Sequence, residues 1–184
     1  MEEIIELIKA DPHYLKNIEY GEPRPGHPEG KVRLHIQDLE KNLELLKLKG
    51  LSANDYWKLM FVIHVHDTFK AEAVKDTPTP HPLNHASLAK QYASQFTDDA
   101  DLLNIIQYHD ENYKLWKEYS RTNQYDSDRF QHLLNTIENW DLFLMFIIID
   151  GCTKGKDYSK LTWFINEVRK YKTTKIDTSW IFDP

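Results

Sequence analysis

The sequence is poor in cysteine and has no long apolar run. Cys152 is the single cysteine among 184 residues, so no intrachain disulfide can form, as is usual inside cells. The longest apolar run, "LFLMFIII" at 142–149, is far too short to span a bilayer. The acidic first residues lack the basic start and apolar stretch of a secretory signal. We therefore expect a soluble, cytoplasmic protein with no membrane partner.

The chain also lacks an excess of positive charge. It has 23 Lys and Arg against 29 Asp and Glu, which gives a net charge of −6. Nucleic-acid-binding domains usually show a basic excess, so this balance argues against a nucleic-acid partner. The composition is otherwise ordinary for a globular protein, with 41% hydrophobic residues. The length suits one domain with a hydrophobic core, and we expect a single domain over residues 1–184.

No stretch of the sequence alternates apolar and polar residues over any length, which argues against strands. Apolar residues instead recur at spacings of three and four, as in "KVRLHIQDLEKNLELLKLK" at 31–49. The predicted fold class is therefore all-α, a single helical bundle. Helices are predicted at 31–49, 52–66, 85–96, 98–110, 111–120, 127–150 and 157–171. Residues 20–30 and 71–82 are rich in proline or glycine and are predicted to be loops.

Several of the predicted helices carry a histidine or an aspartate in register with their apolar faces. These residues are His35, His66, His85, His109 and Asp150, and Asp67 next to His66 makes a sixth. A single such residue is commonly a satisfied core histidine or a helix-end aspartate. Six together, from five helices, are better explained by a shared metal, because unpaired buried charge is costly. Imidazole and carboxylate ligands suit one or two divalent ions of Mn, Fe, Co, Ni or Zn.

The order His … His-Asp … His … His … Asp on a helical chain resembles the HD superfamily of metal-dependent phosphohydrolases. Two local matches carry the resemblance further. "GHPEGKVRLH" at 26–35 is similar to the segment before the first ligand histidine of HD domains related to those of bacterial tRNA nucleotidyltransferases. "HDTFK" at 66–70 matches the frequent His-Asp-x-x-Lys of the family. The resemblance spans about residues 26–156 and implies an HD-type helical domain.

The resemblance also implies roles for individual residues. A core metal site would use His35, His66, Asp67 and Asp150, and a second ion would use His85 and His109, with Asp67 bridging. Asp67 and Lys70 would be catalytic. Asp67 would position or deprotonate a metal-activated water, and Lys70 would neutralise phosphate oxygens. The expected partner is a small phosphorylated substrate, with a nucleotide-like phosphoester as the first guess.

Two other functions stay open at this point. The same ligands would serve a di-iron oxygenase, which the wider HD group allows, or a non-catalytic module that senses a nucleotide. Lys70 also stands where some single-metal nucleotidases of the family have a glutamate. The substrate is therefore not identified by the motifs alone.

Residues near the six ligands have open roles as well. His27 and Glu29 either line the mouth of the site or only stiffen the loop before the first long helix. Asp110 is expected to cap a helix or to orient His109. The aromatic side chains of Tyr113, Trp116 and Tyr119 recur at helical spacing. We expect them to pack in the core or in a lid rather than to form a platform on which bases stack.

Overall fold

The computed structural model describes residues 1–183, and this part of the chain contains helices and no strand. The prediction of an all-α fold is confirmed. The α-helices are α1 (Glu2–Ala10), α2 (Pro12–Asn17), α3 (Val32–Lys47), α4 (Ala53–Val65), α5 (His85–Ala93), α6 (Ala100–Tyr108), α7 (Glu111–Thr122), α8 (Ser127–Thr136), α9 (Trp140–Gly151) and α10 (Ser159–Arg169). Two short 3₁₀ helices are η1 (Thr68–Ala71) and η2 (Thr178–Trp180).

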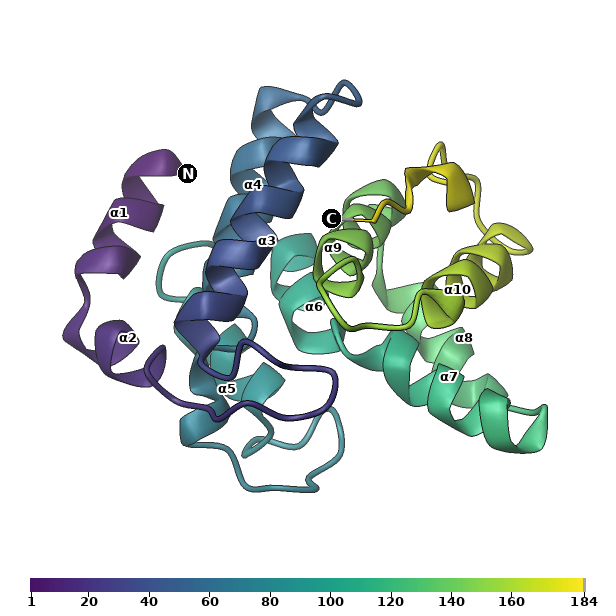
Figure 1. Ribbon diagram of the computed structural model, residues 1–184, viewed down its shortest axis with the longest axis horizontal. Helices are drawn as coiled ribbons and strands as arrows, with labels where there is room; N and C mark the ends of the chain where they lie inside the picture. Colours follow the sequence, from purple (N-terminus) through teal and green to yellow (C-terminus); the bar gives the residue numbers. More distant parts are fainter. Residues whose placement is uncertain (184) are drawn as a thin grey trace.

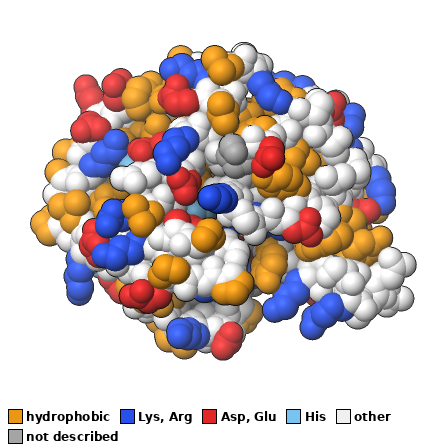
Figure 2. Space-filling model, in the orientation of Figure 1, with side chains coloured by type: hydrophobic (Ala, Val, Ile, Leu, Met, Phe, Trp, Pro, Cys, Tyr) orange, Lys and Arg blue, Asp and Glu red, His pale blue; other side chains and the backbone are white. Residues whose placement is uncertain are grey.

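Helices α3 and α4 form the middle of the molecule. They lie side by side, with α1 and α2 on one side and α7, α8 and α10 on the other (Figure 1). Helix α9 packs against both α3 and α4, and almost all of its side chains are buried. Acidic and basic side chains are interspersed over the face seen in Figure 2. The core therefore runs along α3, α4 and α9, and the ends of these helices bring polar residues to its edge.

Side-chain caps determine where several of the helices begin. Ser52 caps α4, and Asn84 caps α5, so that His85 is the first residue of its helix. Helix α6 is capped by Asp99, which accepts hydrogen bonds from two backbone N–H groups. Thr97, two residues earlier, accepts a hydrogen bond of 3.1 Å from the N–H of Asp99. The helix predicted at 98–110 therefore begins two residues later, at Ala100.

The single long helix predicted at 127–150 is wrong. The structure has two helices, α8 and α9, with a bend of 117° between them. The backbone N–H groups of Glu138 and Asn139 donate to the carboxylate of Asp101, at 3.2 and 3.1 Å. The Asn139 side chain then accepts a hydrogen bond from the N–H of Leu142 and starts α9. A contact with a distant aspartate therefore breaks a continuous apolar pattern.

A buried asparagine holds the end of α9 against α3. Asn42 donates from its amide to the carbonyl oxygens of Ile149 at 2.8 Å and Cys152 at 2.9 Å. The last carbonyl groups of a helix have no partner within it, so this amide satisfies them from outside. His35 lies two turns earlier on α3 than Asn42. The contact therefore fixes where Asp150 stands relative to His35.

Within residues 1–183, no single helix is long and apolar enough to cross a bilayer. Helices α8 and α9 taken together have the length and apolar composition of a membrane span, but a bend of 117° separates them. Most side chains of α9 face the protein core.

Candidate metal centre

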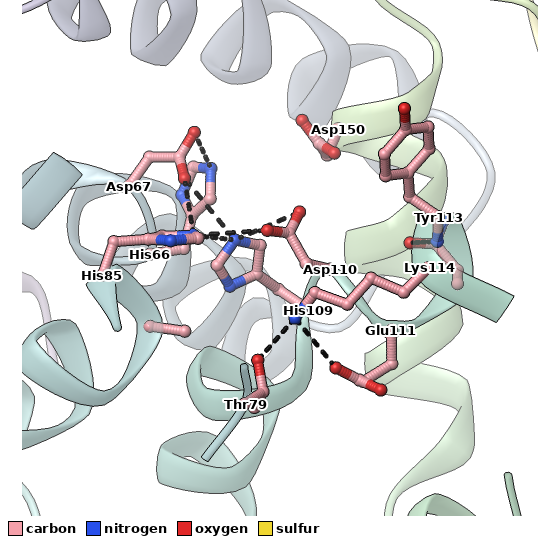
Figure 3. A network of polar contacts seen from close by, with 12 residues as sticks. His66, Asp67, Thr79, His85, His109, Asp110, Glu111, Tyr113, Lys114 and Asp150 are labelled. Carbon is pink, nitrogen blue, oxygen red and sulfur yellow. Dashed lines mark hydrogen bonds and ion pairs between the residues drawn. The ribbon is translucent and has the colours of Figure 1, made fainter. Parts of the chain in front are cut away.

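Four histidines surround the carboxylate of Asp67, which follows the end of α4. His35 belongs to α3 and His85 to α5, whereas His66 and His109 stand at the ends of α4 and α6. Figure 3 shows His66, His85 and His109 around this carboxylate. Its Oδ2 atom lies 3.5 Å from His66 Nε2 and 4.0 Å from His35 Nε2. Its Oδ1 atom lies 3.6 Å from His85 Nε2 and 3.5 Å from His109 Nε2. One carboxylate therefore presents its two oxygens to two different pairs of histidines.

These side chains form compact groups that can hold a metal ion. In one group the ligand atoms of His35, His66 and Asp67 lie within 4.8 Å of one another, and in a second those of Asp67, His85 and His109 do. Both groups are buried or nearly so. Asp67 belongs to both, which is the arrangement expected when one carboxylate serves two ions.

The ring nitrogens are oriented for metal binding. His66 Nδ1 lies 3.0 Å from the carbonyl oxygen of Ile63, and His109 Nδ1 lies 2.8 Å from that of Ile106. A carbonyl oxygen only accepts hydrogen bonds, so we assign a proton to each Nδ1 atom. Each Nε2 lone pair can then face the centre of the site. Backbone contacts therefore fix which nitrogen a metal would meet.

Several of the ligand atoms have no other partner in the described residues. The buried atoms without a hydrogen bond include both ring nitrogens of His35, Nε2 of His66 and Oδ1 of Asp67. A buried polar atom without a partner is costly, and metal ions at this centre would satisfy His35 Nε2, His66 Nε2 and Asp67 Oδ1. His35 Nδ1 lies on the other side of its ring, toward Glu29. The donor set, imidazole plus carboxylate, suits a divalent transition metal. The residues present therefore fit the metal that their pattern predicted.

The charge on Asp67 is stabilised by its neighbours. Burial alone would raise the pKa of its carboxyl group, but the Lys70 ammonium and the His66 ring outweigh burial and hold the pKa well below its usual range. Lys70 Nζ donates directly to Asp67 Oδ2. A carboxylate with so low a pKa is a weak base. Its surroundings therefore suit Asp67 better as a ligand than as a proton acceptor.

Asp150 approaches the centre from the end of α9. Its Oδ1 atom lies 3.0 Å from His35 Nε2 and 2.9 Å from Lys156 Nζ. Lys156 also donates to the backbone carbonyl of Asp150 at 2.8 Å. Burial would raise the pKa of Asp150, but Lys156 and His35 hold it well below its usual range. The Lys156 ammonium shares the carboxylate with His35, so an ion bound here would compete with this lysine for Asp150.

Asp110 supplies a further carboxylate that sequence reasoning did not place among the ligands. Although it stands before the first residue of α7, its side chain makes no capping hydrogen bond, so the cap interpretation is wrong. Its oxygens lie 3.3 Å from His85 Nε2 and 3.6 Å from His109 Nε2. Burial would lower the pKa of His109, but Asp110 and Asp67 raise it to about 9. The signal in the sequence was a second His-Asp pair at a helix end, like that at 66–67.

The loop before α3 contacts the outer side of His35. Glu29 Oε1 lies 3.2 Å from His35 Nδ1 and 2.9 Å from His27 Nδ1. Burial would raise the pKa of Glu29, but these two histidines lower it to about 2. Reciprocal backbone hydrogen bonds between Arg24 and His27 hold the loop in place. The interpretation in which His27 and Glu29 line the site is therefore supported over that of a loop stiffener only.

Replacement of Glu29 by glutamine should weaken binding of the first metal ion by about tenfold or more. A carboxylate on the far nitrogen of a ligand histidine orients the ring and raises its basicity, an effect of roughly 10–100-fold on metal affinity. The measurement is competition of the protein with a chelator, and the number of bound ions should stay the same. Glu22→Gln, in the same loop but exposed, is the matched control. Equal affinities in the two variants would show that Glu29 does not act on His35.

The metal centre opens into a cleft of about 620 Å³, a volume typical of small-molecule sites. Asp67, His66, His109 and Asp150 lie on its metal side. The cleft is also lined by Arg24, His27, Lys70, Asp110, Asn112, Tyr113, Trp116, Lys156, Asp157 and Lys160, together with the loop residues Pro25, Gly26 and Gly155. A small ligand in this cleft would therefore meet the metal ligands and several cations at once.

His64, two residues before His66, does not face the centre. Its ring contacts the Tyr14 hydroxyl at 2.6 Å and Glu40 at 3.2 Å. His64 is therefore a buried histidine with its own partners, and its place two residues before His66 turns it to the other side of the helix.

Comparison with protein-family models, with curated proteins and with solved structures found no match. The resemblance to the HD superfamily therefore stays a prediction from the motifs, and the case for function depends on the geometry of the centre.

Proposed function

We propose that the protein is a metal-dependent phosphohydrolase of the HD type that acts on a small, nucleotide-like phosphoester. The observation that supports this proposal most is the placement of Asp67. One of its carboxylate oxygens faces His35 and His66, and the other faces His85 and His109. Two ions about 3.5–4 Å apart are the usual clamp for phosphoryl chemistry. A carboxylate that belongs to two ligand groups could bind both ions of such a pair.

The chain supplies the ligands and the cations around them. Divalent ions bound at this centre would supply Lewis-acid activation of a water molecule and of the phosphoryl group. Asp67, His35 and His66 would hold one ion. Asp150 would become a further ligand of this ion if its ion pair with Lys156 broke. His85 and His109 would hold the other ion with Asp67, and Asp110 is placed to assist them.

Lys70 stays protonated in this site. Burial would lower its pKa, but the carboxylate of Asp67 raises it above the ordinary lysine value. The ammonium lines the cleft beside Asp67. It would therefore offer a fixed positive charge to the oxygens of a bound phosphate, the role predicted for it.

The cations of the cleft favour a phosphorylated ligand over the substrate of a di-iron oxygenase. Lys70, Lys156 and Lys160 all line it, and an anionic substrate needs such partners. A di-iron oxygenase would need the same metal ligands but has no general need for three lysines around them.

The test begins with metal-stripped protein that is reloaded with Mn(II), or anaerobically with Fe(II). Phosphate release from a panel of phosphomonoesters and phosphodiesters is measured beside oxygen uptake. We expect metal-dependent phosphate release without oxygen uptake. Oxygen uptake with no phosphate release would support the oxygenase instead, and nucleotide binding without any turnover would support the sensing module.

A further inference from the structure

Two kinds of cation line the cleft. Lys70 and Lys156 are each paired with a carboxylate of the metal centre. Lys160 and Arg24 have no carboxylate within 4.0 Å among residues 1–183, and of these two Lys160 is the less exposed. Burial lowers the pKa of Lys160, so its charge is costly in the absence of an anion. Lys160 is therefore the cleft cation most in need of an external anionic partner.

An aromatic wall stands next to Lys160. Tyr113 lines the cleft from α7 and is 48% exposed, so it does not pack in the core, which was one of the positions that its spacing suggested. Lys160 Nζ lies 5.7 Å from the centre of the Tyr113 ring. Trp116, one turn further along α7, lines the same cleft and is backed by Trp163, with ring centres 5.6 Å apart. In Figure 3 Tyr113 and Asp150 lie on one side of the view, and Asp67 and His66 lie on the other.

We infer that Tyr113 and Lys160 form the substrate-selecting wall of the cleft, and that the substrate is a phosphoester that carries a flat aromatic ring, such as a nucleobase. This inference deepens the proposed function and rests on it for the position of the reacting phosphate. The ring of the substrate packs on Tyr113, and the ammonium of Lys160 binds an anionic oxygen of the same molecule.

The positions of Tyr113 and Lys160 determine which ligands this wall of the cleft would bind best. An exposed ring with a lysine ammonium over it offers a planar apolar surface and a positive charge within one small area. Stacking of a base on an aromatic side chain contributes enough to change affinity by about tenfold or more. The cleft of about 620 Å³ suits a molecule of mononucleotide size and not a folded nucleic acid. A phosphoester without a ring would lose the contact with Tyr113 and keep that with Lys160.

The experiment measures binding of two phosphonates, which the enzyme cannot hydrolyse as esters. Phenylphosphonate carries a ring and methylphosphonate does not, and calorimetry compares their affinities for the full chain, both metal-loaded and metal-stripped. We expect phenylphosphonate to bind about tenfold tighter to the wild-type protein. Tyr113→Ala should remove this preference, and Tyr113→Phe should keep it. Lys160→Gln should weaken both ligands by a similar factor, because both carry the anionic group.

The controls are residues of the same type outside the cleft. Tyr171→Ala and Lys117→Gln remove exposed side chains and should leave both affinities unchanged. Equal binding of the two phosphonates to the wild-type protein, binding of neither, or an unchanged preference in Tyr113→Ala would each overturn the inference. Because the probes are not turned over, a ring preference that depends on Tyr113 would stand even if no phosphoester were hydrolysed. That outcome would contradict the proposed phosphohydrolase function and would still support the role of Tyr113 and Lys160 in ligand selection.

Discussion

Replacement of Asp67 by alanine is expected to abolish metal-dependent phosphate release, by about a thousandfold or more, while the helical circular dichroism persists. The reason is that both candidate ion positions use this one carboxylate. The variant removes the carboxylate that is common to the group of His35 and His66 and to the group of His85 and His109. No other carboxylate among residues 1–183 lies within 4.0 Å of all these histidines.

The Asp67 variant needs controls because it also removes the partner of Lys70. A buried cation without its carboxylate destabilises a protein, so the fold must be checked separately from activity. Asp67→Asn keeps the size of the side chain and an acceptor for Lys70, and should be inactive as well. Asp98→Ala removes an exposed aspartate near the start of α6 and should be fully active. Full hydrolysis by either Asp67 variant, free of contaminating phosphatase, would rule out the proposed mechanism.

Replacement of His109 by alanine should reduce the number of bound ions from two to one. His109 contributes Nε2 to the group that contains Asp67 and His85, and its Nδ1 atom is fixed by the carbonyl of Ile106. Loss of this nitrogen leaves too few neutral donors at the second position, while the group of His35, His66 and Asp67 stays intact. His85→Ala should have the same effect on the ion count.

The measurement is titration of metal-stripped protein with Mn(II) or Fe(II), in which stoichiometry and activity are followed together. His132→Ala serves as the control, because His132 is an exposed histidine that contacts Tyr108 away from the centre. Wild-type protein should take up two equivalents. Saturation at one equivalent, unchanged in His85→Ala and His109→Ala, would mean that these histidines serve the substrate and not a second ion.

Much of the fold could be predicted from local pattern. The spacing of apolar residues on 31–49 predicts α3, which spans Val32–Lys47, and it places His35 on the buried face. Ser52 predicts the start of α4, and the pattern places His66 on its inward face. These predictions depend only on residues within a few turns of each other, where helical geometry fixes direction.

Contacts between distant segments could not be predicted in the same way. The break between α8 and α9 depends on Asp101, which lies more than thirty residues before the bend. The approach of Glu29 to His35 requires the loop to fold back over α3, and the pairing of Lys156 with Asp150 requires a turn after α9. Tyr113 has a helical spacing typical of core residues, and only the packing of α7 shows that it lines a cleft.

The central claim is that the two oxygens of Asp67 serve two metal ions, and anomalous diffraction from crystals of the Mn(II)-loaded protein tests it most directly. The account predicts two anomalous peaks about 3.5–4 Å apart, one between Asp67 and the pair His35–His66 and the other between Asp67 and the pair His85–His109. A single peak away from Asp67, or no peak among these five side chains at saturating Mn(II), would contradict it.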